Sequence, residues 1–433
     1  ADQIAAVDAL KTLGDDSAML FNAFGVTAST VTRQQVEGAD VIVLLNSNVT
    51  EENPVLSFTL KRAVRKGAAL ISVSAMEVEM NNFASLWVHT RRGTNTALLN
   101  AAISEILKAG RYDEAQINRL TENFGAFKEQ KFISLAEAED TTGVDKADIQ
   151  RFAEMISEPG KKVVFIYNRS SVVEKSEGDL QAIANIQLLT GNIGKDNAGI
   201  LLTGDHSNYQ GHKDLFATPH APRENRRLGD PQGSRTYAEL KEALLGGTIK
   251  GMLIFGEDFA VSKEHEDILS AAEFVAVVDM FENETTGFAH VAIPGTAYAE
   301  TEGCVTSQDR KVQAFTRIFE PPAGKTALEI LAGLYAKVSG KTAPSIADVR
   351  SDIAGINPLY RKIVDIGEHG SFSWNETEAG GELLFATGFL TPSGKAAFTL
   401  GGDQAQKPFR RQTFCFSSID KVYRSSRYVL FAQ

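Results

Sequence analysis

The chain has 433 residues, of which 43% are hydrophobic and 23% are charged, which excludes disordered, collagen-like and coiled-coil proteins. This length predicts two or three separate hydrophobic cores. Acidic residues outnumber basic ones by 55 to 44, giving a formal net charge of −11. Such a charge repels phosphate backbones and anionic lipids, so we expect no nucleic-acid partner.

The chain has only two cysteines, Cys304 and Cys415. An iron–sulfur cluster is usually held by four ligands, so we expect no cluster in this chain. His206 and His212 are spaced like metal ligands, but no second Cys or His pair completes a four-ligand set, and we assign no metal site. No apolar run approaches the length of a membrane span, so we expect no direct membrane insertion. The acidic start of the sequence is not a signal peptide, which favours a cytoplasmic location.

The first half of the sequence alternates short apolar runs with amphipathic segments, which predicts an α/β fold. The predicted strands are 40–45, 69–73, 86–89 and 162–167. The predicted helices are one from about residue 52, one capped by Thr94 and ended by Gly110, and one around 180–188. Helical periodicity throughout 112–158 indicates a helical insertion. We therefore expect a first α/β domain over 1–202.

A long polar stretch, 203–235, precedes a second run of alternating elements. A helix is predicted at 237–245. It is followed by a strand at 251–255, a helix at 262–272 and strands at 274–278 and 290–293. We expect a second doubly wound α/β domain over 203–340. The Gly-rich remainder, 341–433, is expected to be an irregular tail that completes this second domain.

Polar residues follow three of the predicted strands, where ligands bind in open parallel sheets. They are Asn46, Ser47 and Asn48, then Gly256, Glu257 and Asp258, then Asp279, Asn283, Thr285 and Thr286. Glycine permits close backbone approach, and the carboxylates can accept hydrogen bonds from a guanine edge or a ribose. Ordinary turn and cap residues would explain any one cluster, but three together favour a ligand site. The sequence has no dinucleotide GxGxxG or P-loop motif, no GxSxG elbow and no HExxH motif.

Several segments together resemble the molybdopterin oxidoreductase superfamily, from about residue 17 to about residue 400. These segments include 38–46, 53–55, 62–68, 93–100, Leu188–Gly194, Asn208–Gly211, Gly256–Asp258 and 299–313. The resemblance is nearest to formate dehydrogenase alpha chains and to the large iron–sulfur subunit of NADH-quinone oxidoreductase. It implies two doubly wound parallel-sheet domains of the formate dehydrogenase/DMSO reductase type, the second and third domains of that fold.

The resemblance also implies a cofactor, molybdopterin guanine dinucleotide, and leaves open whether it is bound. The residues that would line its cleft are Asn46, Asn48, Asn208, Gln210, Gly211, Gly256, Glu257, Asp258, Asp279, Thr285 and Thr286. No catalytic residue and no metal ligand is assigned to this chain. The family's cysteine cluster motif, its metal-ligating Cys, selenocysteine or Ser, and its carboxy-terminal barrel are all expected to lie outside it.

Two departures from the family pattern bear on activity. Ser74-Ala75-Met76 stands where the family usually has Asp-Pro-Arg, whose acid can pair with guanine. Thr203 precedes Gly204 where formate dehydrogenases have a formate-binding arginine. Without that cation a formate carboxylate lacks a bidentate partner.

Three hypotheses follow. In the first, the chain is part of the large iron–sulfur subunit of an NADH-quinone oxidoreductase, with a structural, non-catalytic pterin cleft. In the second, it is the cofactor-binding portion of a formate dehydrogenase. In the third, it is a non-enzymatic docking or assembly module that uses Arg223, Arg226, Arg227 and Arg235. The first two imply partners, the other subunits or domains of a redox complex, which could hold the chain at the inner face of a membrane.

Overall fold

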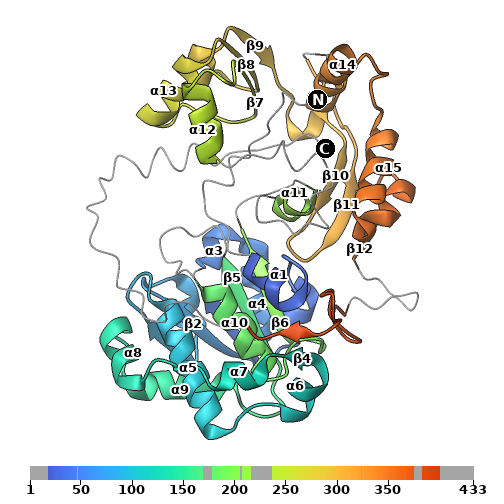
Figure 1. Cartoon of the computed structure of the whole chain (residues 1–433). Coiled ribbons are helices and arrows are strands. Elements are labelled where there is room, and N and C mark those ends of the chain that lie inside the picture. The colour runs from blue at the N-terminus through green and yellow to red at the C-terminus, as the bar shows by residue number, and fades with distance from the viewer. Residues whose placement is uncertain are drawn as a thin grey trace.

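The computed structural model describes residues 18–45, 47–168, 178–204, 207–215, 237–322, 324–374 and 383–399. The larger group of elements, which we call the N-terminal body, lies below two smaller groups in Figure 1. No helix within these ranges is long and apolar enough to cross a membrane.

The N-terminal body is built on a five-stranded parallel sheet in the order β3-β2-β1-β5-β6. Its strands are β1 (Val41–Leu45), β2 (Ala69–Ser74), β3 (Leu86–His89), β5 (Val163–Asn168) and β6 (Gly199–Thr203). Every residue of β1, β5 and β6 is buried. Continuous apolar strands of this kind are typical of a parallel sheet covered on both faces. The predicted α/β class with parallel sheets is therefore confirmed.

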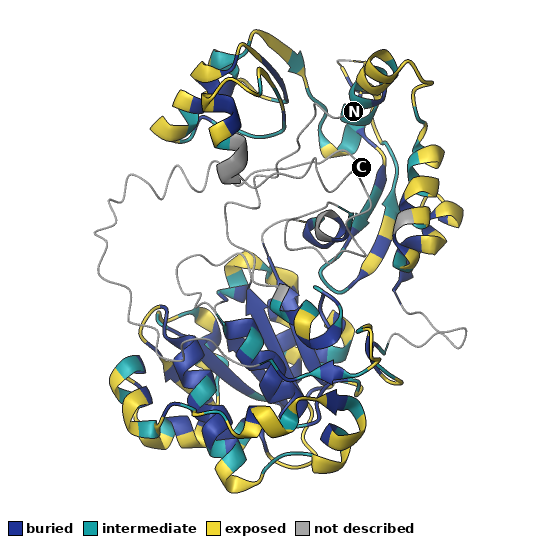
Figure 2. Cartoon of the chain, in the orientation of Figure 1, coloured by how far each residue is buried: buried dark blue, intermediate teal, exposed yellow. Residues whose placement is uncertain are grey.

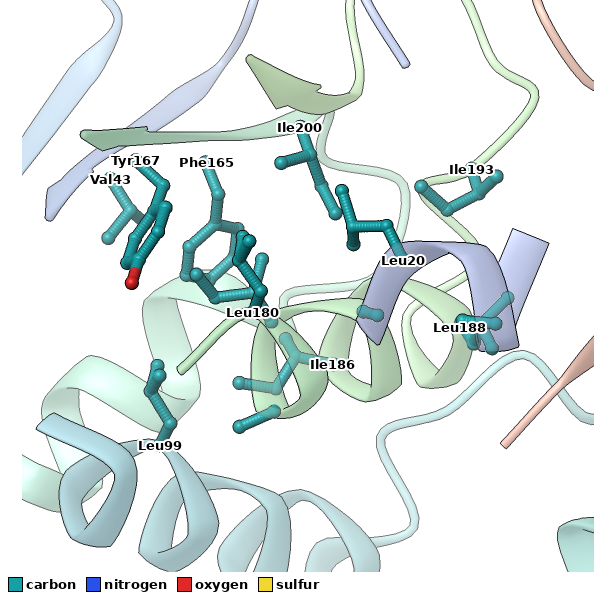
Figure 3. Packing of buried hydrophobic residues seen from close by; sticks show 14 of the residues in the cluster. Leu20, Val43, Leu99, Phe165, Tyr167, Leu180, Ile186, Leu188, Ile193 and Ile200 are labelled. Atoms are coloured by element: carbon teal, nitrogen blue, oxygen red, sulfur yellow. The ribbon is translucent and has the colours of Figure 1, made fainter. Parts of the chain in front are cut away.

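Helices cover both faces of this sheet. One face packs against α1 (Ala18–Phe24), α5 (Asn95–Ala109) and α10 (Asp179–Leu189). Figure 3 shows Phe165 and Ile200 of the sheet pointing toward α10 and α1. The opposite face packs against α2 (Arg33–Val36), α4 (Pro54–Arg65) and the 3₁₀ helix η2 (Glu79–Phe83). Alternate residues of β1, β2, β5 and β6 thus serve two different cores, whereas β3 contributes only to the first.

Short helices complete the N-terminal body. They are α3 (Val49–Glu52), α6 (Glu114–Leu120), α7 (Phe124–Lys128), α8 (Leu135–Thr142) and α9 (Lys146–Ile156). Ser134 begins α8 with a capping box to Glu137, and Gly110 ends α5 in the left-handed region. Thr94 lies at the N-cap of α5, but its hydroxyl donates to the Arg91 carbonyl oxygen at 2.6 Å. The predicted side-chain cap by Thr94 is therefore wrong.

The second group contains a three-stranded parallel sheet in the order β7-β8-β9. Its elements are α12 (Tyr237–Leu245), β7 (Gly251–Phe255), α13 (Lys263–Ala271), β8 (Phe274–Asp279), η4 (Thr285–Phe288) and β9 (Val291–Pro294). One face, with Ile254, Val275 and Val277, packs in a core with Leu244, Ile268 and Leu269 of α12 and α13. On the other face Leu253 and Val291 are 40% and 43% exposed. In Figure 2 this group is accordingly much less buried than the N-terminal body.

The third group is an antiparallel sheet in the order β10-β11-β12, accompanied by helices. Its elements are α11 (Tyr209–Leu215), η5 (Tyr298–Glu300), β10 (Gly303–Thr306), β11 (Lys311–Phe315), α14 (Ala327–Ser339), α15 (Ile346–Ile356), η6 (Pro358–Asp365) and β12 (Ser371–Ser373). Val312, Tyr360 and Phe372 belong to the same hydrophobic cluster as α1, α5 and α10. This sheet is therefore continuous with the core of the N-terminal body.

The segment 383–399 lies elsewhere than the sequence suggested. Its strand β13 (Ala396–Ala397) pairs with β4 (Thr121–Glu122) of the N-terminal body. Phe389 stacks on Phe24 of α1, with ring centroids 5.9 Å apart. We expected all of 341–433 to complete the second domain, but aromatic packing attaches this part to the first core.

Candidate functional site

The carboxyl end of β1 carries two polar side chains within the described residues. Ser47 Oγ donates to Glu52 Oε2 at 2.7 Å, and Thr50 Oγ1 donates to Asn48 Oδ1 at 2.9 Å. The Asn48 oxygen accepts from this hydroxyl, and its amide nitrogen can donate to a ligand. Asn46 lies outside the described residues. The helix α3, directly after Asn48, is at the end of the N-terminal body that faces the smaller groups in Figure 1.

The turn after β2 is bonded to its neighbour strand. Ser74 Oγ donates to the Met76 carbonyl oxygen at 2.7 Å, and Trp87 Nε1 donates to Ser74 Oγ at 3.2 Å. A ring nitrogen of His89 lies 3.2 Å from the Ala75 carbonyl oxygen. These bonds hold the turn in place, and Ser74, Ala75 and Met76 themselves carry no carboxylate.

The loops after β7 and β8 are joined through one carboxylate. Asp258 Oδ1 accepts from Thr285 N at 3.1 Å and from Thr285 Oγ1 at 2.7 Å. Thr285 Oγ1 in turn accepts from Ala260 N at 2.9 Å. Gly256 has φ 57°, a conformation that favours glycine, and its N–H donates to the Val278 carbonyl oxygen. The structure thus brings Asp258 and Thr285 together, as a site at this edge requires.

The loop after β8 has its own set of hydrogen bonds. Asp279 Oδ2 accepts from Asn283 Nδ2 at 3.0 Å, and its Oδ1 accepts from Phe281 N at 3.2 Å. Asn283 Oδ1 accepts from Thr286 N, and Thr286 Oγ1 donates to the Asn283 carbonyl oxygen. The Asp279 carboxylate is half-buried. It therefore sits in a defined position at the carboxyl end of the strand, with Asn283 holding it.

Glu257 lies in the loop after β7, and Asn208, Gln210 and Gly211 lie on α11 and in the turn before it. Asn208 Oδ1 accepts from Thr306 N of β10 at 2.8 Å, and Gln210 Nε2 donates to Asp214 Oδ1 at 2.9 Å. A Cβ built on Gly211 would overlap Asn208 Oδ1 and would lie 3.1 Å from Thr306 Oγ1. Sequence reasoning missed Thr306 and Asp214. Gln210 and Asp214 are four residues apart on a helix, and this spacing was the signal that could have identified Asp214.

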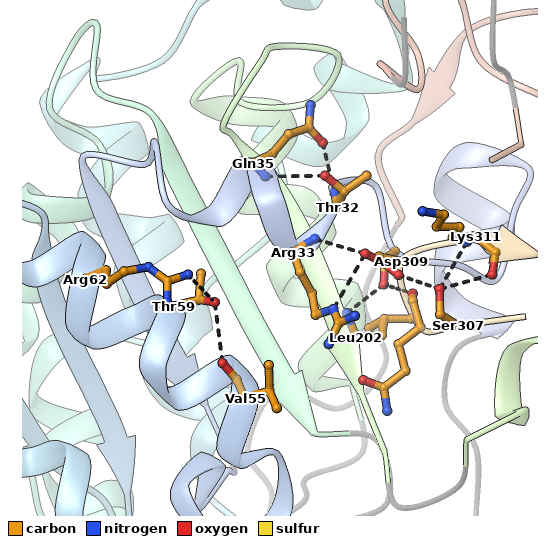
Figure 4. Close-up of polar contacts among 12 residues, drawn as sticks. Thr32, Arg33, Gln35, Val55, Thr59, Arg62, Leu202, Ser307, Asp309 and Lys311 are labelled. Carbon is orange, nitrogen blue, oxygen red and sulfur yellow. Dashed lines mark hydrogen bonds and ion pairs between the residues drawn. The ribbon is translucent and has the colours of Figure 1, made fainter. Parts of the chain in front are cut away.

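A separate pocket of about 360 Å³ lies away from these residues, between α2, α4 and the β10–β11 hairpin. Arg33, Arg62 and Lys311 line it together with Glu37 and Asp309. Figure 4 shows Arg33 and Asp309 joined across this boundary, with Arg33 N donating to Asp309 Oδ2 at 3.2 Å. None of the predicted cofactor residues lines the pocket. Of its charged groups, Arg33 and Asp309 join the hairpin to the N-terminal body, whereas Glu37 and Arg62 pair within that body.

Two further predictions concern metals and thiols. No group of three or more His, Cys, Asp or Glu residues in the described ranges could hold a metal ion. Burial raises the pKa of the Cys304 thiol, and the nearby Arg350 guanidinium only partly opposes this. A thiol with a raised pKa carries little of the reactive thiolate. Cys415, His206, His212, His220 and the arginines at 223, 226, 227 and 235 have no described side chains, so the docking hypothesis built on those arginines stays a prediction.

Comparison with known proteins identifies the family. The sequence model described as Molybdopterin oxidoreductase matches residues 8–337, which is most of the chain. The chain belongs to the molybdopterin oxidoreductase family. It is 28% identical to the F420-dependent formate dehydrogenase subunit alpha of Methanocaldococcus jannaschii, over 86% of this chain and 59% of that protein. It is 25% identical to formate dehydrogenase H of Escherichia coli, over 89% of this chain and 58% of that protein.

The Bacillus subtilis protein named probable oxidoreductase YjgC is 27% identical over 88% of this chain and 41% of its own length. The chain thus spans only about 41 to 59% of these three relatives. Among solved structures, acetylene hydratase from Pelobacter acetylenicus superposes with a TM-score of 0.67 at 17% identity. That match covers 93% of this chain and 61% of the hydratase, and it supports the fold.

Proposed function

We propose that this chain forms the cofactor-binding core of a molybdopterin-dependent redox protein. The observation that carries the proposal is the pair of ordered acidic loops after β7 and β8, bonded to each other through Asp258 and Thr285. Ligands of open parallel sheets bind at this edge. Hydrogen bonds to Asp258 and Asp279 order both loops and so place two carboxylates at the edge where such a ligand would bind.

The donor chemistry of the two edges fits the nucleotide end of such a cofactor. At the N-terminal body the oxygens of Asn48 and Asn208 are engaged, so their amide nitrogens can donate to diphosphate oxygens. At the second sheet Glu257, Asp258 and Asp279 present carboxylates, which accept from the N–H groups of guanine or from ribose hydroxyls. Gly256 permits close approach of the backbone, and Thr285 and Thr286 order the loops. Gln210 and Gly211 shape the Asn208 turn. Asn46, which lies outside the described residues, is proposed as a further residue of the cofactor site.

Bound molybdenum would supply the two-electron redox chemistry, which this chain's side chains cannot. The described residues contain no group of three or more His, Cys, Asp or Glu side chains that could hold a metal ion, and we assign no molybdenum ligand among them. The role of this chain is accordingly to bind and orient the nucleotide, with other subunits or domains of a redox complex as its partners.

Expression of the full chain in a cell that makes the cofactor tests this role. Pterin and guanine nucleotide per mole of purified protein should be near stoichiometric for the wild type, and Asp258→Ala should lower both at least about tenfold. Asp267→Ala on α13 is the matched control, because that carboxylate is exposed and pairs only on the surface with Lys263. Wild-type protein that never acquires pterin under these conditions would rule the proposal out.

Two parent complexes remain candidates. The names of the relatives at 25 and 28% identity favour a formate dehydrogenase. Thr203 and the Ser74–Met76 turn favour a non-catalytic region in the large iron–sulfur subunit of an NADH-quinone oxidoreductase. Molybdenum or tungsten analysis of the complete native protein, with a formate oxidation assay, separates them. Near-stoichiometric metal and formate turnover support the dehydrogenase, whereas pterin without turnover supports the structural role.

A further inference from the structure

Five polar residues form a connected, mostly buried network behind the Asn208 turn. Tyr360 Oη donates to Asp214 Oδ2 at 2.6 Å and lies 2.9 Å from Thr306 Oγ1. Gln210 Nε2 donates to the other oxygen of Asp214 at 2.9 Å, and Thr306 N donates to Asn208 Oδ1 at 2.8 Å. Thus α11, β10 and η6, which are distant in sequence, are joined behind the Asn208 amide that is proposed to face the cofactor, and Gln210 is fully buried within the network.

The network fixes which end of the Asn208 amide is presented. A backbone N–H can only donate, so the bond from Thr306 N requires that the Asn208 oxygen point toward β10. The amide nitrogen is then the outward end, and none of the described residues accepts a hydrogen bond from it. Half-buried Asn208 therefore offers donors to a ligand that carries acceptor oxygens.

Tyr360 is the residue on which this arrangement depends. Its side chain is 1% exposed, and its ring contacts Trp374 edge to face at a centroid distance of 5.7 Å. Burial, reinforced by the Asp214 charge, raises the pKa of Tyr360 well above its ordinary value. The hydroxyl consequently stays protonated and donates to the 5% exposed Asp214 carboxylate. Removing it would take one hydrogen-bond donor away from a buried carboxylate, which is costly.

We propose that Tyr360, acting through Asp214 and Thr306, is a positioning residue that holds the Asn208 amide as a hydrogen-bond donor to the diphosphate of a pterin dinucleotide. This inference rests on the proposed function. The hydroxyl touches no ligand itself. The hydroxyl holds α11 against β10. Gly211 allows this close approach, because a Cβ at that position would overlap Asn208 Oδ1.

The first test compares pterin retention by Tyr360→Phe with retention by two controls in the full chain. Tyr112→Phe removes a hydroxyl that bonds to Lys128 at 3.1 Å, far from α11 in sequence. Ile149→Val truncates a fully buried side chain of α9 and supplies general destabilisation. We expect Tyr360→Phe to release pterin about ten times faster than the wild type, and both controls to release it at the wild-type rate. Amide hydrogen exchange over 207–215 should accelerate only in Tyr360→Phe.

A second test addresses the donor directly. Asn208→Asp keeps an oxygen for Thr306 N but turns the outward group into a carboxylate oxygen, which repels diphosphate. We expect it to retain less pterin than Asn208→Ala. The reverse order would overturn the donor assignment, since it would mean that an acceptor is tolerated at that position.

The outcomes separate the two proposals. Wild-type protein without pterin would overturn the proposed function and this inference with it. If the wild type retains pterin and Tyr360→Phe retains it equally well, only the positioning role is overturned. A loss in Ile149→Val equal to that in Tyr360→Phe, at matched melting temperature, would likewise overturn it, because general destabilisation would then be sufficient.

Discussion

Gly211 shows how closely α11 approaches its neighbours at the scale of single residues. Any Cβ there would overlap Asn208 Oδ1 and crowd Thr306 Oγ1. Gly211→Ala should therefore lower the free energy of unfolding by about 1–3 kcal/mol, as overpacked sites do. Gly333→Ala in α14 is the control, because nothing lies within 4 Å of its added Cβ. Denaturant unfolding should show that variant unchanged or up to about 1 kcal/mol more stable. Equal effects at the two glycines would contradict the crowding.

Glu37 gives a prediction for the pH dependence of stability. Hydrogen bonds from Arg62, then from Lys66, lower the pKa of the Glu37 carboxyl to about 2. A carboxyl with a depressed folded-state pKa contributes stability above its unfolded pKa, and that contribution is lost as pH falls through the folded value. The stability difference between wild type and Glu37→Gln should thus be largest above about pH 5 and vanish near pH 2. Urea unfolding across this range measures it, with the exposed Glu158→Gln as control. A constant difference would refute the ion-pair explanation.

The sequence could locate some site residues and not others, for a physical reason. Gly256, Asp258 and Asp279 follow apolar strands, so the rule that ligands bind at the carboxyl ends of strands finds them locally. Tyr360 and Thr306 contact α11 and the turn before it across sequence separations of 146 and 98 residues. No periodicity encodes such contacts. They depend on how η6 and β10 pack, and they became visible only in the folded chain.

At the scale of elements, β7 has one covered and one uncovered face. Ile254 is 8% exposed and packs under α12 and α13, whereas its neighbour Leu253 is 40% exposed on the opposite face. Ile254→Ala should cost about 2–5 kcal/mol of unfolding free energy, and Leu253→Ala less than about 1 kcal/mol. Chemical denaturation of both variants measures this difference. Similar losses would mean that Leu253 is covered in solution.

The same strand shows the limit of the sequence pattern. The apolar runs 41–45, 163–167 and 251–255 look alike in sequence, and each was correctly predicted as a parallel strand. A continuous apolar run normally indicates burial on both faces, which holds for β1 and β5 but not for β7. Whether a strand is buried on both faces depends on which helices pack against the sheet, and the sequence of the strand does not contain that information. Phe385 and Phe389 were likewise not predicted as core residues, because they lie in a Gly-rich segment.

At the scale of the whole molecule, the hydrophobic clusters divide the described chain into two unequal parts. Val312 and Phe372 of the antiparallel sheet share the core of the N-terminal body, whereas Val275 and Val277 belong to the separate core of the β7-β8-β9 sheet. Groups with separate cores can unfold independently. We therefore expect two calorimetric transitions, with the small parallel sheet, open on one face, unfolding first.

Substitutions in each core identify the transitions. Val277→Ala should destabilise the small sheet by about 1–3 kcal/mol and lower the first melting temperature by at least about 4 °C, while the second stays in place. Phe165→Leu, in the fully buried β5, should lower only the second. Hydrogen exchange should assign the early transition to amides within 251–294. If both variants shift a single transition together, then contacts between the small sheet and its neighbours couple the two cores into one cooperative unit, and the independence of the small sheet is refuted.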